Sequence, residues 1–268
     1  MQEQVTVWDA RSGALRVQWG ARPRKTPKHK PTLVPLPWVY GLAWSGDGSR
    51  LAVHTHCFFD RTRPALSVWD VARAQRLAVL DGGEDSTGTI AWSPDSSLIA
   101  AIAGEHNVSL WRADDYTLVH QWRTEGPDEV AALAWSDDST SLAASVGNHV
   151  EIWDVAQEQV GSRCLGHTGN VGHLSWATDG QRLATISDDY MLYIWRAQEG
   201  RPLGVLVIPR GVVRSLSWQD ALIVTYDDGT IMSWEACADP ASTLDGGSEP
   251  RALSVDERAR YGLPSPID

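Results

Sequence analysis

The chain has 268 residues, 43% of them hydrophobic, and a formal net charge of −11. This composition is that of a soluble globular protein, and no apolar run approaches the roughly 20 residues that span a bilayer. The start of the chain has neither the basic nor the apolar region of a secretory signal. Three scattered cysteines argue against a disulfide framework and for a reducing compartment. We therefore expect a cytoplasmic protein with no membrane association.

The charge is unevenly distributed. A basic cluster within residues 22–30 holds all three lysines of the protein and two arginines. Because the whole chain is at −11 and this cluster is at +5, the remainder is at −16. An acidic surface disfavours nucleic acid and anionic membranes. The cluster is the exception, and it consists of Arg22, Arg24, Lys25, Lys28 and Lys30.

The chain opens on two predicted strands, residues 4–9 and 14–19, joined by a turn at Ser12-Gly13. A segment with five prolines follows at residues 20–37 and contains the basic cluster. Proline cannot join a central strand ladder, so this segment is predicted to be an extended insertion. It is either a docking arm or a solvated linker.

The next repeat begins at Trp38 and contains a second insertion. Its two marker tryptophans, Trp44 and Trp69, are 25 residues apart, whereas the corresponding spacing in the next three repeats is 18 or 19. The extra residues are predicted to lie between the second and third strands of this repeat. They include Phe58 and Phe59, the only two phenylalanines of the protein.

Four further repeats of short alternating strands and tight turns follow. The clearest turn is Gly147-Asn148, a two-residue connection suited to positive φ. The uninterrupted repetition predicts a single domain over residues 1–236. Residues 237–268 are predicted to be a largely irregular tail with one short strand at 252–255, which would form the outer edge of the last sheet.

Tryptophans mark the repeat period. Trp69, Trp111, Trp153 and Trp195 are each 42 residues apart, and Trp234 follows 39 residues later. A fixed period of this length, made of strands and turns, is the signature of a propeller whose small sheets pack on their neighbours. We interpret these indoles as core residues.

The chain resembles the WD40-repeat β-propeller family. The Trp-Asp dipeptide of that family stands at Trp8-Asp9, Trp69-Asp70 and Trp153-Asp154, and its Gly-His pair at Gly166-His167. The resemblance implies an all-β propeller with about five full four-stranded blades and an N-terminal half-blade. Three explanations of the half-blade stay open: a fragment of a longer propeller, a strained closed ring, or completion by another chain.

The resemblance also implies a buried network in which a His, a Thr or Ser, an Asp and the Trp are linked. The repeat at 166–196 has all four residues at matching spacing. A buried indole N–H needs an acceptor, a hydroxyl can accept that bond and donate onward, and the Asp fixes the imidazole tautomer. We interpret this network as structural rather than catalytic, and its members are His167, Thr185, Asp189 and Trp195.

Family topology implies that the two insertions emerge on one face of the second repeat. Aromatic and arginine side chains anchor interfaces more than other types do, although the phenylalanines could instead cover their own blade. We predict a partner-binding patch composed of Lys25, Lys28, Lys30, Phe58, Phe59, Arg61 and Arg63.

The sequence contains few residues that could form a catalytic or metal-binding site. The predicted innermost strands carry no carboxylate, and only His173 and Arg214 are candidate polar groups there. His54 and His56, two apart on a strand, could begin a metal site with Cys57 or Asp60, but no second His/Cys cluster supports one. We expect no cofactor, no metal and no enzymatic activity.

Two functional classes remain. The first is a non-catalytic protein-interaction scaffold or regulatory binding module that uses propeller-face loops, with a partner of unknown identity. The alternative is nucleic-acid or phospho-ligand binding through the basic 22–30 arm, which would be steeply salt-dependent.

Overall fold

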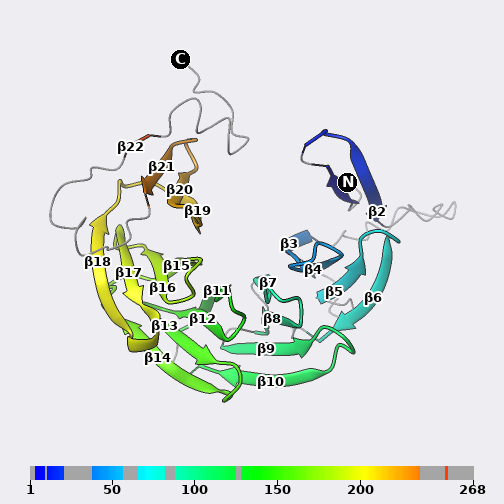
Figure 1. Cartoon of the computed structure of the whole chain (residues 1–268), viewed down its shortest axis with the longest axis horizontal. Helices are drawn as coiled ribbons and strands as arrows, with labels where there is room; N and C mark the ends of the chain where they lie inside the picture. Colours follow the sequence, from blue (N-terminus) through cyan, green and yellow to red (C-terminus); the bar gives the residue numbers. More distant parts are fainter. Residues whose placement is uncertain are drawn as a thin grey trace, which may run out of the picture. The chain divides into compact units, whose positions relative to one another are not determined.

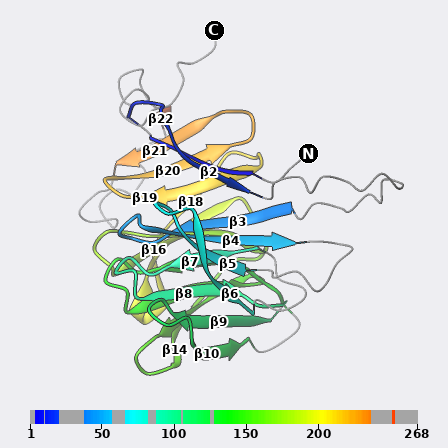
Figure 2. The same cartoon turned by 90° about the vertical axis from the view of Figure 1, so that its right-hand side faces the viewer.

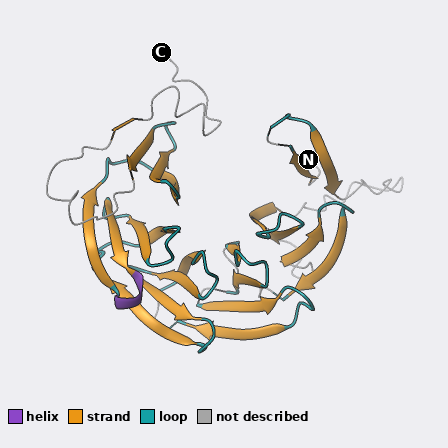
Figure 3. Ribbon diagram, viewed as in Figure 1, coloured by secondary structure: helices purple, strands orange, loops and turns teal. Residues whose placement is uncertain are grey.

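A computed structural model describes residues 4–9, 11–20, 38–56, 66–81, 88–104, 106–124, 128–235 and 251–252. These residues form strands and loops, with one short 3₁₀ turn, η1 (Ala197–Glu199), and no α-helix (Figure 3). No helix in the described part of the chain is both long and apolar enough to cross a membrane. By its internal contacts the chain divides into two compact units, Met1–Leu133 and Ala134–Asp268.

The first unit begins with a two-stranded sheet that carries the predicted opening strands. It is followed by a four-stranded sheet, and by a second in which neighbouring strands lie in the order of the chain (Figures 1 and 2). The strands are β1 (Gln4–Trp8), β2 (Leu15–Gly20), β3 (Trp38–Trp44), β4 (Arg50–His56), β5 (Leu66–Asp70), β6 (Gln75–Leu80), β7 (Ile90–Trp92), β8 (Leu98–Ile102), β9 (Asn107–Arg112) and β10 (Leu118–Arg123).

The sheet at the unit division has the same four-stranded antiparallel order, and two more such sheets follow in the second unit. The strands are β11 (Val130–Trp135), β12 (Ser141–Val146), β13 (His149–Asp154), β14 (Gln159–Leu165), β15 (Val171–Trp176), β16 (Arg182–Ser187), β17 (Met191–Arg196), β18 (Arg201–Val207), β19 (Val213–Trp218), β20 (Ala221–Tyr226), β21 (Ile231–Glu235) and β22 (Arg251–Ala252).

The structure therefore confirms the all-β fold class, with five four-stranded sheets preceded by a two-stranded one. The strand predicted at 252–255 lies at Arg251–Ala252, where it pairs with β21 and forms the outer edge of the last sheet. The strand β7 begins at Ile90, and Gly88 before it adopts φ of +89°, outside the strand region.

The buried core lies between successive sheets. In the first unit, Leu66 and Val68 of β5 join Ile99 and Trp111 of the following sheet in one apolar cluster. In the second unit, Ile186 and Leu192 cluster in the same way with Trp218 and Trp234. Each sheet thus buries its apolar face only against a neighbour, as a repeat of thin sheets requires.

A repeated turn joins the first two strands of three sheets. Buried Ser45, Ser93 and Ser136 each donate a hydrogen bond of 2.5–2.6 Å to an Asp two residues later. Each serine oxygen also accepts a bond from the backbone N–H that opens the second strand. The Ser45 hydroxyl lowers the pKa of Asp47 to about 2. This Ser-x-Asp turn fixes the hairpin geometry.

Candidate functional site

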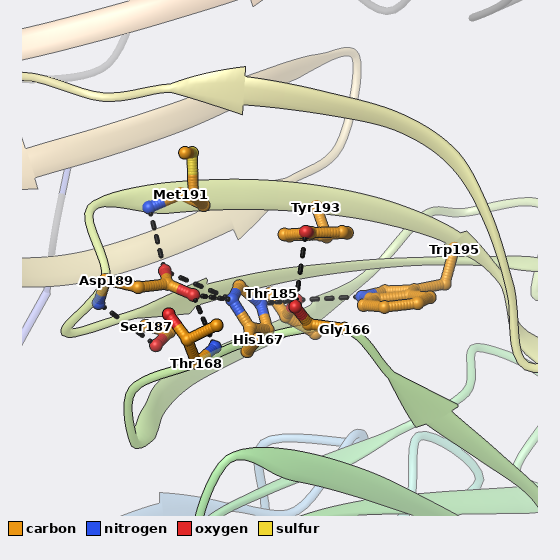
Figure 4. Close-up of polar contacts among 9 residues, drawn as sticks. All are labelled: Gly166, His167, Thr168, Thr185, Ser187, Asp189, Met191, Tyr193 and Trp195. Atoms are coloured by element: carbon orange, nitrogen blue, oxygen red, sulfur yellow. Dashed lines mark hydrogen bonds and ion pairs between the residues drawn. The ribbon is translucent and has the colours of Figure 1, made fainter.

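The four side chains of the predicted network come together in the sheet β15–β18 (Figure 4). His167 precedes β15, Thr185 lies on β16, Asp189 lies in the β16–β17 turn and Trp195 lies on β17. The Thr185 Oγ1 atom is 2.7 Å from His167 Nε2 and 2.8 Å from Trp195 Nε1. The His167 Nδ1 atom is 3.0 Å from Asp189 Oδ2.

One assignment of protons satisfies every contact. The Trp195 indole N–H donates to the Thr185 hydroxyl, whose own proton goes to His167 Nε2. The His167 Nδ1–H then donates to the Asp189 carboxylate, which also accepts the backbone N–H groups of Thr168 and Met191. In this arrangement Nε2 accepts the hydroxyl proton and Nδ1 carries the ring proton, so the imidazole is neutral.

The pKa shifts of His167 and Asp189 agree with that assignment of protons. Burial lowers the pKa of His167 and outweighs the neighbouring Asp189, which acts to raise it. Burial acts to raise the pKa of Asp189, but the hydrogen bonds from the Thr168 N–H and from His167 leave it lowered. At neutral pH the pair is therefore a neutral imidazole beside a carboxylate.

An aromatic residue that the motif does not include completes the cluster. The Tyr193 ring stacks on Trp195 at 4.8 Å and meets His167 edge-on at 4.5 Å, and its hydroxyl donates to the Gly166 carbonyl. The sequence position of Tyr193 could have indicated this contact, because Tyr193 lies two residues before the repeat tryptophan. It faces Thr185 across the sheet.

In other sheets a different residue accepts the hydrogen bond from the indole N–H of the repeat tryptophan. In the sheet of Trp69, Val53 stands in the place of Thr185, and the indole N–H donates to Ser67 Oγ at 2.9 Å. In the sheet β11–β14, Ala144 stands there. The indole of Trp153 then donates to the buried Glu151 carboxylate at 3.2 Å.

The acceptor for the indole N–H therefore lies at one of two positions that face each other across the sheet. Thr185 is opposite Tyr193, Val53 is opposite Ser67, and Ala144 is opposite Glu151. In the last sheet the facing pair is Val224 and Met232, and neither offers an oxygen acceptor. The buried Trp234 Nε1 accordingly has no hydrogen-bond partner among the described residues.

A nucleophilic reaction has no support in this cluster. The His167 side chain is buried, and both of its ring nitrogens are engaged within the sheet. The Thr185 hydroxyl is fully buried between the imidazole and the indole. A substrate carbonyl therefore has no access to the one His-Asp pair that the sequence motif contains.

The innermost strands carry structural polar contacts. His173 on β15 contacts the Val213 carbonyl of β19 through Nε2 at 3.2 Å, and burial lowers its pKa. Arg214 is exposed on β19. Within the described ranges no group of three or more His, Cys, Asp or Glu side chains could hold a metal ion. His54 is buried on β4, while Cys57 and Asp60 lie outside those ranges.

The predicted partner-binding residues also lie outside the described residues. This applies to every member of the set, namely Lys25, Lys28, Lys30, Phe58, Phe59, Arg61 and Arg63. The strands from which the two insertions start and to which they return are described. Trp38, which opens β3 after the first insertion, is the cross-strand partner of His56, which ends β4 before the second.

Comparison with known protein families gives two matches. Residues 158–196 match the family described as "WD domain, G-beta repeat". Residues 90–168 match "Anaphase-promoting complex subunit 4 WD40 domain". The first match covers the repeat that holds His167, Thr185, Asp189 and Trp195.

Comparison with curated proteins finds relatives of greater length. The chain is 33% identical over 219 residues to "WD repeat and SOCS box-containing protein 1" of Takifugu rubripes, covering 74% of this chain and 48% of that protein. It is 25% identical over 218 residues to "B-type cell cycle switch protein ccs52A" of Medicago truncatula, covering 79% of this chain and 36% of that protein. The chain thus spans half or less of the length of these relatives.

Among solved structures, a chain in "Crystal Structure of Mitotic Checkpoint Complex" matches with a TM-score of 0.73. The match covers 93% of this chain and 71% of that chain at 20% identity. A likeness at this identity is a likeness of fold, and function has to be argued from the site.

Proposed function

From the premise that the chain belongs to the WD40-repeat β-propeller family, we propose that it is a non-catalytic protein-interaction module. Its partner would dock on the loops at one end of the sheet β3–β6. The residues that we assign to this contact are those of the predicted patch: Lys25, Lys28, Lys30, Phe58, Phe59, Arg61 and Arg63.

The observation that carries this proposal is the pairing of Trp38 with His56. The insertion with all the lysines returns to the sheet at Trp38, and the insertion with both phenylalanines leaves it at His56. The two insertions are therefore attached at one end of one strand pair. Basic and aromatic side chains tethered together form the kind of surface that anchors a protein partner.

The other observations favour binding over catalysis. The one His-Asp pair with a catalytic pattern is consumed by hydrogen bonds inside the sheet. The relatives reported above are named as WD-repeat and cell-cycle switch proteins, and neither name is that of an enzyme. The acidic remainder of the chain, at −16, favours a protein ligand over nucleic acid for the basic arm.

The test is partner capture by the full chain from its native source, followed by affinity measurement with the purified partner. One variant replaces the three lysines with Glu, and a second replaces Phe58 and Phe59 with Ala. We expect each variant to weaken binding at least tenfold, because interface anchors contribute about 2 kcal/mol or more each, and to leave thermal stability nearly unchanged.

The matched control replaces three exposed arginines outside the patch with Glu. They are Arg76, Arg123 and Arg214. It changes the net charge by the same amount, so retained binding would show that position and not charge is decisive. Equal loss of binding in the control would count against the patch. Unfolding of the Phe58→Ala/Phe59→Ala variant would instead assign these residues to the core.

A further inference from the structure

The loops that enter the last two sheets follow the same backbone course. Before β15, the Asn170 carbonyl accepts the N–H of Asp188 at 3.0 Å, and before β19 the Val212 carbonyl accepts the N–H of Asp227 at 3.0 Å. These equivalent bonds align residues 166–170, the first entry loop, with residues 208–212, the second entry loop. By this alignment Pro209 stands in the place of His167.

The proline leaves the second entry loop without the anchor that holds the first. His167 ties the first loop to Thr185 and to Asp189 (Figure 4). Proline has no side-chain donor and no N–H with which to make these bonds. In the described part of the chain, Asp228, the equivalent of Asp189, accepts hydrogen bonds from Thr230 and from no residue of the second entry loop.

The second entry loop is instead contacted by Tyr190, which belongs to the turn between β16 and β17 of the preceding sheet. The Tyr190 carbonyl accepts the N–H of buried Ile208 at 2.9 Å. The Tyr190 ring faces the guanidinium of Arg210, whose central carbon is 5.4 Å from the ring centre. Both side chains are exposed. A residue of one sheet thus contacts the loop that leads into the next.

Tyr190 adopts a backbone conformation that disfavours its side chain. Its φ is +62°, in the left-handed region, and its N–H donates to the Ser187 carbonyl at 3.1 Å. The equivalent turn of the last sheet has Gly229 there, with φ of +85° and a matching bond to the Tyr226 carbonyl. Glycine takes this conformation without steric cost, whereas a residue with a Cβ does not. Tyr190 therefore carries a backbone strain that glycine would avoid.

The remaining support of the second entry loop is apolar. A Cβ atom on Gly211 would lie 3.1 Å from the Tyr226 ring, so this ring lies directly beside the loop. The Tyr226 hydroxyl has no hydrogen-bond partner among the described residues. Arg210 is the one residue of the loop with a polar side chain. Its contact with Tyr190 is therefore the directional side-chain contact that this loop makes.

We infer that Tyr190 and Arg210 form a clasp, which holds the second entry loop against the sheet β15–β18 in place of the histidine network that this loop lacks. A guanidinium is attracted to the face of a tyrosine ring even at an exposed site. Both sheets lie in the second unit, so the clasp is independent of the loop patch proposed above. Opening the clasp would release the loop while the strands on either side stay paired.

The test is native-state amide exchange in the full chain, measured at Ile208 and Asp227, whose N–H groups form hydrogen bonds at the two ends of the loop. Tyr190→Leu keeps a side chain at this φ but removes the aromatic face, and Arg210→Gln removes the cation. Each variant should speed exchange at both amides about twofold to fivefold. The double variant should be no faster than either single variant, because both remove the same contact.

A rescue variant and a matched control accompany this test. Tyr190→Trp should restore slow exchange, because an indole is the best partner for a guanidinium. Arg201→Gln removes an exposed arginine at the other end of β18 and should leave both amides unchanged. Equal acceleration in this control would overturn the clasp, as would additive effects in the double variant. Equal acceleration throughout β16 and β17 would also overturn it, since the substitutions would then have lowered only global stability.

Tyr190→Gly separates the strain from the contact. Glycine relieves the strain but gives the unfolded chain more freedom, so the urea midpoint should change little. Exchange at Ile208 and Asp227 should nevertheless be faster, because the ring is gone. Slower exchange at these amides in Tyr190→Gly would show that the ring holds nothing, and it would overturn the proposal.

Discussion

The sheets β15–β18 and β19–β22 bury the same tryptophan in two different polar environments. Trp195 and Trp234 are both buried at the same repeat position. The first donates to Thr185 within a network that reaches Asp189, whereas the second faces Val224 and Met232. These two sheets therefore bury the indole alike, while satisfaction of its N–H depends on the individual residues around it.

A buried donor without a partner costs about 1–3 kcal/mol, so among the described residues the last sheet carries a penalty that its neighbour avoids. The neighbour, in return, depends on every member of its network, because removing one leaves the others unpaired. Substitution should therefore reduce the stability of β15–β18, called the polar sheet below, more than that of β19–β22.

The largest effect is expected from replacing each indole with a phenyl ring. Trp195→Phe should destabilise the protein by about 2–4 kcal/mol, because it leaves a cavity and deprives the Thr185 hydroxyl of its donor. Trp234→Phe should cost at least ~1 kcal/mol less, since it removes a donor that has no partner among the described residues. Urea unfolding followed by circular dichroism measures both losses, and equal values would show that the hydrogen bond from Trp195 to Thr185 adds nothing to stability.

A smaller effect is expected from exchanging the residues that face the indoles. Thr185→Val gives the polar sheet the residue of the last one, and it should cost about 1–3 kcal/mol by stranding the Trp195 N–H and His167 Nε2. The reciprocal Val224→Thr offers an acceptor to Trp234 and should change stability by less than about 1 kcal/mol. Amide exchange in β17 and β21 localises each effect, and a neutral Thr185→Val would show that the hydroxyl is not needed.

The smallest effect is a pH dependence that comes from the histidine of the sheet β15–β18. Because the folded-state pKa of His167 is lowered, the unfolded chain binds more protons in the range below the ordinary histidine value. Stability should therefore be fully present above about pH 6.5 and decline as the pH falls below it. The lowered pKa of Asp189 adds a further loss at lower pH, as its carboxylate becomes protonated.

Unfolding measured at several pH values between neutral and mildly acidic checks this dependence. His167→Gln should flatten the decline in part, and the remainder should come from His173, whose pKa is also lowered by burial. His173→Gln is the matched variant outside the network. If the slope of stability against pH is the same in His167→Gln as in the unmodified chain, the neutral imidazole is not the titrating group.

Much of the fold follows from the sequence alone. The 42-residue spacing from Trp69 to Trp195 and the alternating strands between them predict thin antiparallel sheets, because a short repeat of strands can bury its apolar face only against its neighbours. The motif at 166–196 likewise determines which four side chains meet, since each strand position fixes the side on which its residue points.

Tertiary structure decided what no periodicity encodes. The Trp153 indole donates to Glu151, and the Trp69 indole donates to Ser67. These acceptors depend on which residues face each other across two strands, and the register between strands is a long-range property. That Trp8 and Trp44 are exposed depends on what packs over them, which their own repeats do not specify. A repeat sequence determines its own sheet, whereas the cover of that sheet belongs to its neighbour.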